Sequence, residues 1–77
     1  MVRGDIMTAR SFYEQAVAMQ PRASAALIAA GKSYDPNILR LFGTGTDMAD
    51  TAKARERYER ARVLGAPNAA ALLGSLR

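Results

Sequence analysis

The chain has 77 residues, which is enough for one small domain that buries a limited share of its surface. It contains no Cys and no His, which excludes disulfides, thiolate nucleophiles, imidazole bases and the usual ligands of structural zinc. Its net charge of +4 and pI near 10.1 are compatible with an acidic partner, a class that includes nucleic acid and an anionic membrane surface.

Two helices joined by a tight turn are predicted for the first part of the chain. Asp5 is expected to cap the first helix, and apolar residues then recur every three or four positions as far as Gln20. Pro21 ends this helix, and a second one is predicted over residues 22–34, where small side chains permit close approach. We therefore expect an αα-hairpin.

The central segment carries the signals of a short helix followed by a loop. Asp35 and Pro36 end the second helix and also form a typical start for a new one, with proline in its first turn. The apolar residues of 38–42 suit a short helix that folds back onto the hairpin. The glycine- and threonine-rich stretch 43–47 then predicts the main loop.

The last third of the chain predicts a second helical pair. Asp50 is expected to cap a helix that runs to about Leu64, where Gly65 and Pro67 terminate it. An alanine- and leucine-rich helix is predicted over residues 68–76.

The two pairs share an internal repeat with an offset of 45 residues. The identical positions are Asp5 and Asp50, Ala9 and Ala54, Arg10 and Arg55, Tyr13 and Tyr58, Glu14 and Glu59, and Ala16 and Ala61. Duplication of a helix pair at such a period is typical of an α-solenoid, in which each unit buries its apolar face against its neighbour.

Each half also carries small and aromatic residues at the spacing of a known motif. In the first half these are Gly4, Asp5, Ala9, Tyr13, Ala16, Pro21, Leu27, Ala30, Gly31 and Tyr34. In the second half they are Gly43, Thr44, Gly45, Asp50, Lys53, Ala54, Tyr58, Arg60, Ala61, Gly65, Ala69, Leu73 and Gly74. The first set resembles the tetratricopeptide motif, and the second resembles the Sel-like class of these repeats.

This resemblance covers about residues 4–77 and implies an all-α fold. It implies two tetratricopeptide or Sel-like αα-hairpins with a short extra helix or ordered loop between them, as a fragment of a right-handed α-solenoid. The chain is then a single repeat domain with a first unit (4–34), an insertion (35–49) and a second unit (50–77).

The resemblance also gives packing roles to the motif residues. Alanines are expected where helices touch, at Ala9, Ala16, Ala54 and Ala61. Tyr13 and Tyr58 are expected to fill the space between successive hairpins, and Gly31 and Gly74 to mark the closest helix contacts. These roles concern the fold and carry no chemistry of their own.

Two departures from the family pattern are visible. Residues 35–42 form an insertion, which is either a lip beside a binding groove or a short apolar helix that fills the small core. The chain also begins on the second helix of one repeat and ends on the first helix of another, and solenoids generally need about three repeats. We therefore expect a piece of a longer protein or a homodimer, in which the apolar stripe of the helix over 68–76 docks onto a preceding domain or a second copy.

The resemblance places partner binding in the groove lined by the helix over 22–34. The groove-facing positions would be Ala25, Ile28, Lys32 and Asp35. The clamp with which the family binds C-terminal carboxylates needs basic and amide side chains at several of these positions. Of the four residues, only Lys32 has such a side chain. The favoured interpretation makes Lys32 a solvated residue at the end of its helix, where a cation suits the helix dipole.

An alternative partner is nucleic acid, contacted by the four arginines at positions 55, 57, 60 and 62 of the third long helix. Glu56 and Glu59 lie at spacings that favour pairing with these arginines, and no aromatic residue interleaves with them for base stacking. An ordinary solvated helix face is therefore the expectation, and nucleic acid is not the favoured partner.

The residues provide no catalytic apparatus. Most of the seven carboxylates fall at helix caps or beside arginines, and the serines have no imidazole partner. We expect no enzyme activity, no cofactor, no metal and no membrane span, and the start of the chain, which lacks a signal peptide, favours the cytoplasm. The predicted function is protein–protein interaction or scaffolding; the alternatives are nucleic-acid binding and a regulatory tail of a larger protein.

Overall fold

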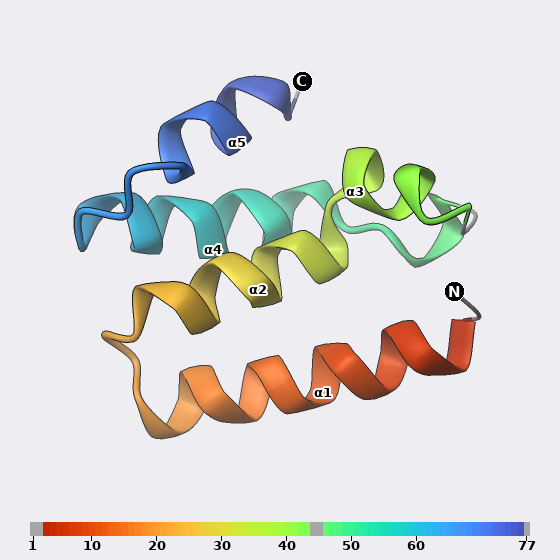
Figure 1. Ribbon diagram of the computed structural model, residues 1–77, viewed down its shortest axis with the longest axis horizontal. Coiled ribbons are helices and arrows are strands. Elements are labelled where there is room, and N and C mark those ends of the chain that lie inside the picture. The colour runs from red at the N-terminus through yellow and green to blue at the C-terminus, as the bar shows by residue number, and fades with distance from the viewer. Residues whose placement is uncertain (1–2, 44–45, 77) are drawn as a thin grey trace.

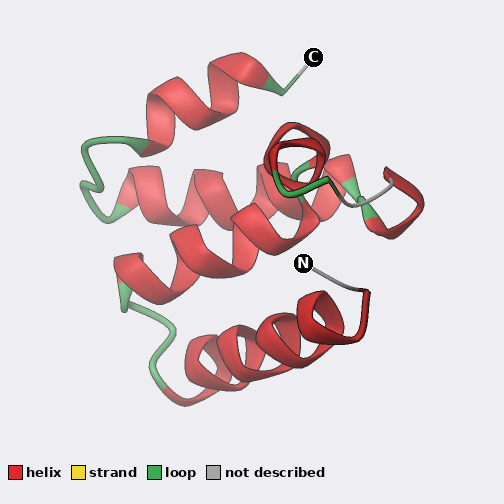
Figure 2. Ribbon diagram, turned by 45° about the vertical axis from the view of Figure 1, so that its right-hand side comes forward, coloured by secondary structure: helices red, strands yellow, loops and turns green. Residues whose placement is uncertain are grey.

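The chain is folded from helices throughout the part that the computed structural model describes, residues 3–43 and 46–76. No strand occurs in these ranges, which confirms the all-α prediction for them (Figures 1 and 2). In chain order the elements are α1 (Arg3–Met19), α2 (Ser24–Tyr34), α3 (Pro36–Leu41), the 3₁₀ helix η1 (Thr46–Met48), α4 (Thr51–Val63) and α5 (Ala69–Ser75).

The first helix begins earlier than the sequence predicts. The expectation that Asp5 caps it is wrong, because α1 already begins at Arg3 and Asp5 lies within the first turn. A carboxylate at that place still stabilises the helix, since it lies at the positive end of the helix dipole. The helix ends at Met19, and the next residue, Gln20, donates its N–H to Ala16 O at 2.9 Å.

The second helix begins two residues later than predicted. Residues 21–22 form a turn, and Ala23 precedes the helix in an extended conformation, without a side-chain capping bond. Six residues of α2 are buried. Because a short helix without a cap is marginal in water, tertiary packing is what stabilises α2.

Two carboxylates cap helices as predicted. Asp35 Oδ1 accepts a hydrogen bond from Asn37 N at 2.8 Å at the start of α3, with Pro36 in the first turn. Asp50 Oδ1 accepts one from Lys53 N at 3.0 Å at the start of α4. The predicted short central helix and third long helix are therefore both confirmed.

The boundaries of the last two helices are close to their predicted positions. Gly65 has a φ of +93°, the left-handed conformation that commonly follows a helix end, and α4 stops at Val63. α5 is one residue shorter at each end than the predicted range 68–76. Thr44 and Gly45 of the predicted loop lie outside the described residues.

Helix α2 lies between α1 and α4 in both overall views, and α5 packs on α4 (Figures 1 and 2). Consecutive long helices reverse direction. α3 lies beside the end of α2 and contacts η1, and Asn37 Nδ2 of α3 donates to Ser75 O at the end of α5, at 2.9 Å.

Two apolar clusters form the core. The main cluster lies around α2 and α4 and contains Val17, Leu27, Ile28, Ala30, Tyr34, Ala54, Tyr58, Ala61, Ala69 and Leu76. The smaller one joins α1, α3 and η1 through Ile6, Leu39 and Met48.

The main helix contact brings Tyr58 of α4 against Gly31 of α2. A Cβ atom on Gly31 would lie 2.5 Å from Cε1 of the Tyr58 ring, so only glycine fits without a shift. The Tyr58 side chain is fully buried, and its hydroxyl donates to Asp35 Oδ2 at 2.8 Å. The predicted close contact at Gly31 is confirmed, but the one at Gly74 is wrong, because a Cβ there would meet no atom within 4 Å.

The two copies of the sequence repeat are buried to different extents. Ala54, Tyr58 and Ala61 are fully buried in α4. Their counterparts in α1 are not, since Tyr13 is 38% exposed and Ala16 is exposed. The packing roles implied by the family resemblance therefore hold for α4 and are wrong for Tyr13 and Ala16.

Gly31→Ala is predicted to destabilise the protein by about 1–2 kcal/mol, because the added methyl group overlaps a tyrosine ring that is fixed by its own hydrogen bond. Gly74→Ala is the matched control. It places the same methyl group in open space within a helix and should stabilise the fold by up to about 1 kcal/mol. Urea unfolding measures both effects, and equal midpoints for the two variants would contradict the assignment.

Candidate functional site

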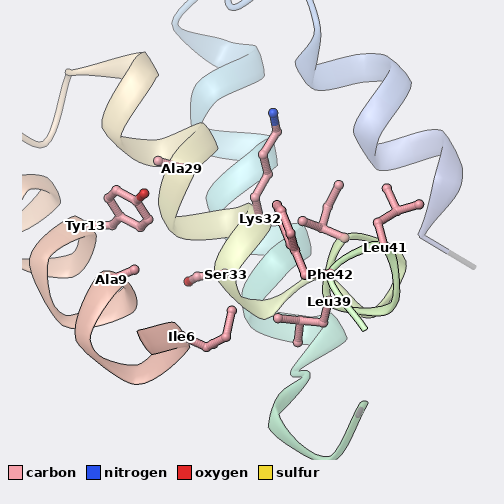
Figure 3. A pocket seen from close by; sticks show the side chains of 10 residues that line it. Ile6, Ala9, Tyr13, Ala29, Lys32, Ser33, Leu39, Leu41 and Phe42 are labelled. Carbon is pink, nitrogen blue, oxygen red and sulfur yellow. The ribbon is translucent and has the colours of Figure 1, made fainter. Parts of the chain in front are cut away.

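An apolar groove lies between α1, α2 and α3 and has a volume of about 310 Å³ (Figure 3). Its lining residues are Ile6, Ala9 and Tyr13 from α1, Ala29, Lys32 and Ser33 from α2, and Ile38, Leu39, Leu41 and Phe42 from α3 and the residue after it. We call it the α1–α3 groove. It joins segments that are distant in the sequence.

The groove has a buried floor and an exposed rim. Ile6 and Leu39 are buried and belong to the smaller core cluster. Around them Leu41 is 81% exposed, Phe42 is 52% exposed and Tyr13 also faces water. Large apolar side chains that gather at one exposed place mark a contact surface more often than scattered ones do.

Few polar groups face this groove. The Ser33 hydroxyl is already engaged, because it donates to Ala30 O at 2.6 Å. Lys32 lines the wall with its apolar stem, and Figure 3 shows its ammonium group at the outer edge, away from Ile6 and Leu39. The groove therefore offers mainly apolar contact, with one cation at its edge among the lining residues.

The exposed rim depends on how α3 is attached to the core. Asp35 caps α3 and also accepts the hydrogen bond from the buried Tyr58 hydroxyl, so the start of α3 is fixed to α4. Leu39 then points into the core, whereas Leu41 and Phe42 remain exposed at the groove. The insertion thus contributes Leu39 to the smaller core cluster and forms the edge of the groove with Leu41 and Phe42, which we call its lip. A binding role for this lip stays a prediction.

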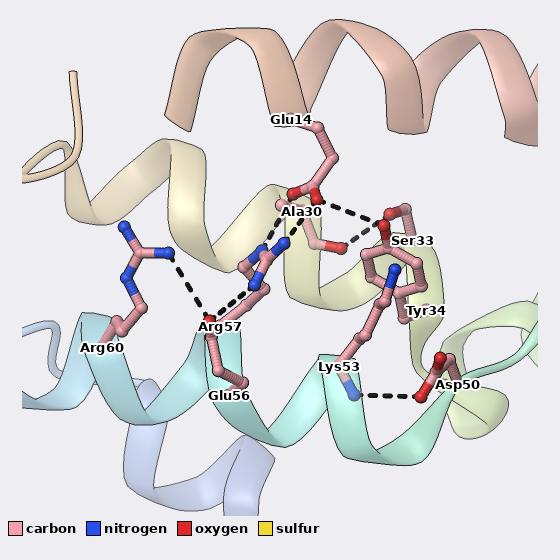
Figure 4. A network of polar contacts seen from close by, with 9 residues as sticks. All are labelled: Glu14, Ala30, Ser33, Tyr34, Asp50, Lys53, Glu56, Arg57 and Arg60. Carbon is pink, nitrogen blue, oxygen red and sulfur yellow. Dashed lines mark hydrogen bonds and ion pairs between the residues drawn. The ribbon is translucent and has the colours of Figure 1, made fainter. Parts of the chain in front are cut away.

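A polar network fixes α1 against α4 (Figure 4). Glu14 accepts a hydrogen bond from Arg57 Nε at 2.9 Å and another from the Tyr34 hydroxyl at 3.2 Å. Arg57 Nη1 also donates to Glu56 at 2.6 Å. The bond from Arg57 holds the pKa of Glu14 below its ordinary value of 4.5, and burial followed by the charge of Glu14 raises the pKa of Tyr34.

Arg10 ties α1 to the end of α2 and to η1. Its Nη2 donates to Ser33 O at 2.5 Å and to Met48 O at 2.6 Å, and its guanidinium carbon lies 4.1 Å from the centroid of the Tyr34 ring. A cation is favourable beside the carbonyl end of α2 and over an aromatic face. Arg10 therefore positions α1, which forms one wall of the α1–α3 groove.

The four residues predicted to bind a partner do not share one surface. Lys32 lies in the α1–α3 groove, whereas Ala25 and Ile28 line a separate hollow beside residues 66–68. Asp35 is 1% exposed, and both of its carboxylate oxygens are bonded within the chain. Their spacing places them on one stripe of α2, but residues 66–68 and α3 pack beside that stripe and divide it.

Most of the arginines of α4 are paired with carboxylates. Arg60 Nη1 lies 3.5 Å from Glu56, which confirms the predicted pair at i and i+4. Arg62 Nε donates to Glu59 at 2.5 Å, and Arg57 is held between two glutamates as described above. These contacts neutralise much of the charge that phosphate binding would require.

The described residues contain neither a helix with the length and apolar character of a membrane span nor a cluster of three acidic side chains that could hold a metal ion.

No protein-family model, curated protein or solved structure matches this chain. The α1–α3 groove is therefore interpreted from its own geometry.

Of the residues that line this groove, the sequence singles out only Lys32 as a binding residue. The repeat assigns Tyr13 to packing because it matches Tyr58, and Leu41 and Phe42 enter only as part of the 35–42 insertion. One signal in the sequence indicates their exposure. Leu41 and Phe42 are adjacent and directly precede Gly43, so a short helix that ends there cannot bury both side chains.

Glu14→Gln is predicted to lower the stability at neutral pH by about 0.5–1 kcal/mol, because it removes the charge that pairs with Arg57. A carboxyl group whose folded pKa is lowered stabilises the fold above its ordinary pKa, and this stabilisation is lost as the pH falls through the folded value. The difference from the wild type should therefore shrink below pH 4.5 and disappear once the pH is below the lowered pKa of Glu14.

The measurement is urea unfolding of both proteins across the acid range. Glu59→Gln is the control, since its exposed pair with Arg62 lies within one helix and should contribute about 0.3–0.5 kcal/mol. A difference for Glu14→Gln that persists unchanged in acid would contradict the role of its charge.

Proposed function

We propose that this protein is a non-catalytic interaction module whose α1–α3 groove binds a helix of a partner protein. The proposal is carried by one observation: Tyr13, Leu41 and Phe42 are exposed around a single apolar groove. Covering them would remove apolar surface from water, at about 25 cal/mol for each Å².

The shape of the groove favours a helix as its occupant. Its walls are faces of helices, and the small side chains of Ala9 and Ala29 allow another helix to come close. A helix also satisfies its own backbone hydrogen bonds, which suits a surface with few free polar groups. A peptide that binds as an extended strand would need backbone partners that this groove does not present.

A relationship to tetratricopeptide or Sel-like repeats is part of the same proposal. It is supported by the repeated motif residues, by the alternating direction of the four long helices and by the close Tyr58–Gly31 contact. Repeats of this type are expected to bind peptides or partner domains in helix-lined grooves. Here the insertion would add α3 as a lip to such a groove.

Ala9→Arg is predicted to abolish binding of helical peptides, because a long charged side chain would fill the wall of the groove. A displayed library of helical peptides would first be selected on the wild-type protein, and the enriched peptides measured by fluorescence anisotropy. We expect their affinity for Ala9→Arg to fall at least about tenfold, which corresponds to about 1.4 kcal/mol.

Ser11→Arg is the control, because Ser11 is exposed on the same helix and does not line the groove. It should leave the affinity unchanged, and circular dichroism should show the same helicity for both variants. Selected peptides that bind Ala9→Arg as tightly as the wild type, or a selection that enriches none, would overturn the proposed function.

A further inference from the structure

We propose that the helix bound in the α1–α3 groove is acidic, with a small residue against the ring of Tyr13 and a carboxylate that accepts a hydrogen bond from the Tyr13 hydroxyl. This inference rests on the proposed function, because it names the chemistry of the helix that the groove accepts. Two features of the groove carry it: an exposed tyrosine whose buried counterpart has both of these partners, and a lysine that forms no ion pair with the described residues.

The contact between Tyr58 and α2 shows what such a tyrosine accepts. Its ring packs on Gly31, where a Cβ atom would overlap it, and its hydroxyl donates to Asp35 Oδ2 at 2.8 Å. Asp35 follows Gly31 by four residues, about one helical turn, so both groups meet the tyrosine from the same side. Ala54 and Ala61 flank Tyr58 on α4 and are fully buried in the same cluster. A tyrosine between two alanines is thus matched by a glycine and a carboxylate one turn later.

Helix α1 repeats this pattern but packs through a neighbouring face. Ala9, Tyr13 and Ala16 are the counterparts in the sequence repeat. The buried residues of α1 that the structure describes are instead Ile6 and Val17, which lie on the neighbouring face, since Val17 is turned by about 100° from Ala16. Tyr13 is therefore 38% exposed and Ala16 is exposed. The face that α2 covers in α4 is open to a further helix in α1.

The Tyr13 hydroxyl forms no hydrogen bond with the residues that the structure describes. Its ring lines the groove beside Ala9 and Ala29, and Figure 3 shows it directed from α1 toward α2. An apolar helix that covered this side chain would remove the hydroxyl from water without replacing its bonds, which is unfavourable. The bound helix must therefore bring an acceptor, and the buried counterpart of Tyr13 uses a carboxylate for this purpose.

The charges around the groove also favour an acidic helix. None of its lining residues is acidic, and Asp5, next to Ile6 in the sequence, does not line it. Lys32 lines it, with its ammonium group at the outer edge (Figure 3). The ion pairs of the described residues join arginines to glutamates, and Lys32 takes part in none of them. A carboxylate on the bound helix would therefore meet an unpaired cation, and the net charge of +4 attracts such a helix from a distance.

The test starts from a displayed library of alanine-rich helical peptides, selected on the wild-type protein. One central position is varied, and so is the position four residues after it. We expect glycine or alanine to be enriched at the first and aspartate or glutamate at the second. Fluorescence anisotropy then compares an enriched peptide with the matching peptide that has the amide, asparagine or glutamine, in place of the carboxylate. The carboxylate peptide should bind about tenfold more tightly, because a hydrogen bond to a charged acceptor is stronger than one to an amide.

Two variants of the protein locate the carboxylate. Tyr13→Phe keeps the ring and removes the hydroxyl, so it should weaken binding of the carboxylate peptide about tenfold and of its amide counterpart much less. Lys32→Gln should weaken binding of the carboxylate peptide about threefold, and this effect should fade as salt is added. Arg55→Gln is the control, because it removes the same charge from an exposed residue outside the groove and should change the affinity little. Binding of the amide peptide by each variant would show that the variant is folded.

The remaining outcomes separate this inference from the proposed function. Peptides that bind the wild type and not Ala9→Arg, but show no preference for a carboxylate, overturn the inference and leave the groove as a helix-binding site. A carboxylate preference that is unchanged in Tyr13→Phe or in Lys32→Gln places the carboxylate elsewhere and also overturns it. If only an unrestricted helical library yields binders, the inference fails alone; if neither library does, the proposed function fails with it.

Discussion

The buried hydrogen bond between Tyr58 and Asp35 fixes α2, α3 and α4 against one another and so positions two of the three walls of the groove. The ring of Tyr58 sets how closely α4 approaches α2, because it packs directly on Gly31, where a Cβ atom would overlap it. Its hydroxyl fixes the carboxylate that begins α3. Burial, followed by the effect of Asp35, raises the pKa of Tyr58 above its ordinary value of 10, so the phenol remains a neutral donor. The same tyrosine therefore fixes both the packing of α4 on α2 and the position of α3, which forms the lip of the groove.

The attachment of α1 has a different physical basis. Only Ile6 and Val17 of this helix belong to the buried core of the described residues, whereas Arg10 and Glu14 bond to α2, α4 and η1 through charged groups. Charged bonds specify geometry more strictly than apolar contact does, because they require direction as well as distance. This difference explains how one face of α1 stays open while the helix as a whole is fixed.

Local signals allowed the sequence to predict the helices and most of their ends. The caps at Asp35 and Asp50 and the stop at Gly65 depend on neighbouring residues alone, and the structure confirms them. The start of α1 was misplaced because Asp5 is favourable both as a cap and in a first turn. These predictions needed no knowledge of tertiary contacts.

The candidate site was not predictable in the same way. A repeat shows that Tyr13 and Tyr58 are equivalent in sequence, but burial depends on which helix lies opposite each of them. The groove forms only when α1, α2 and α3 are packed together. The predicted binding stripe of α2, which includes Ile28, is divided only when residues 66–68 pack beside it. The pairing of Glu14 with Arg57 across two helices likewise has no counterpart in local spacing.

The hydrogen bond from Asn37 to Ser75 connects α3 with the end of α5. Asn37 lies in α3, which forms the lip of the groove, and Ser75 is the last residue of α5. A displacement of α3 strains or relaxes this bond, so the position of the lip and the order at the end of α5 are thermodynamically linked. Such linkage is reciprocal, so anything that displaced the end of α5 would also act on the lip of the α1–α3 groove, although no residue of α5 lines it.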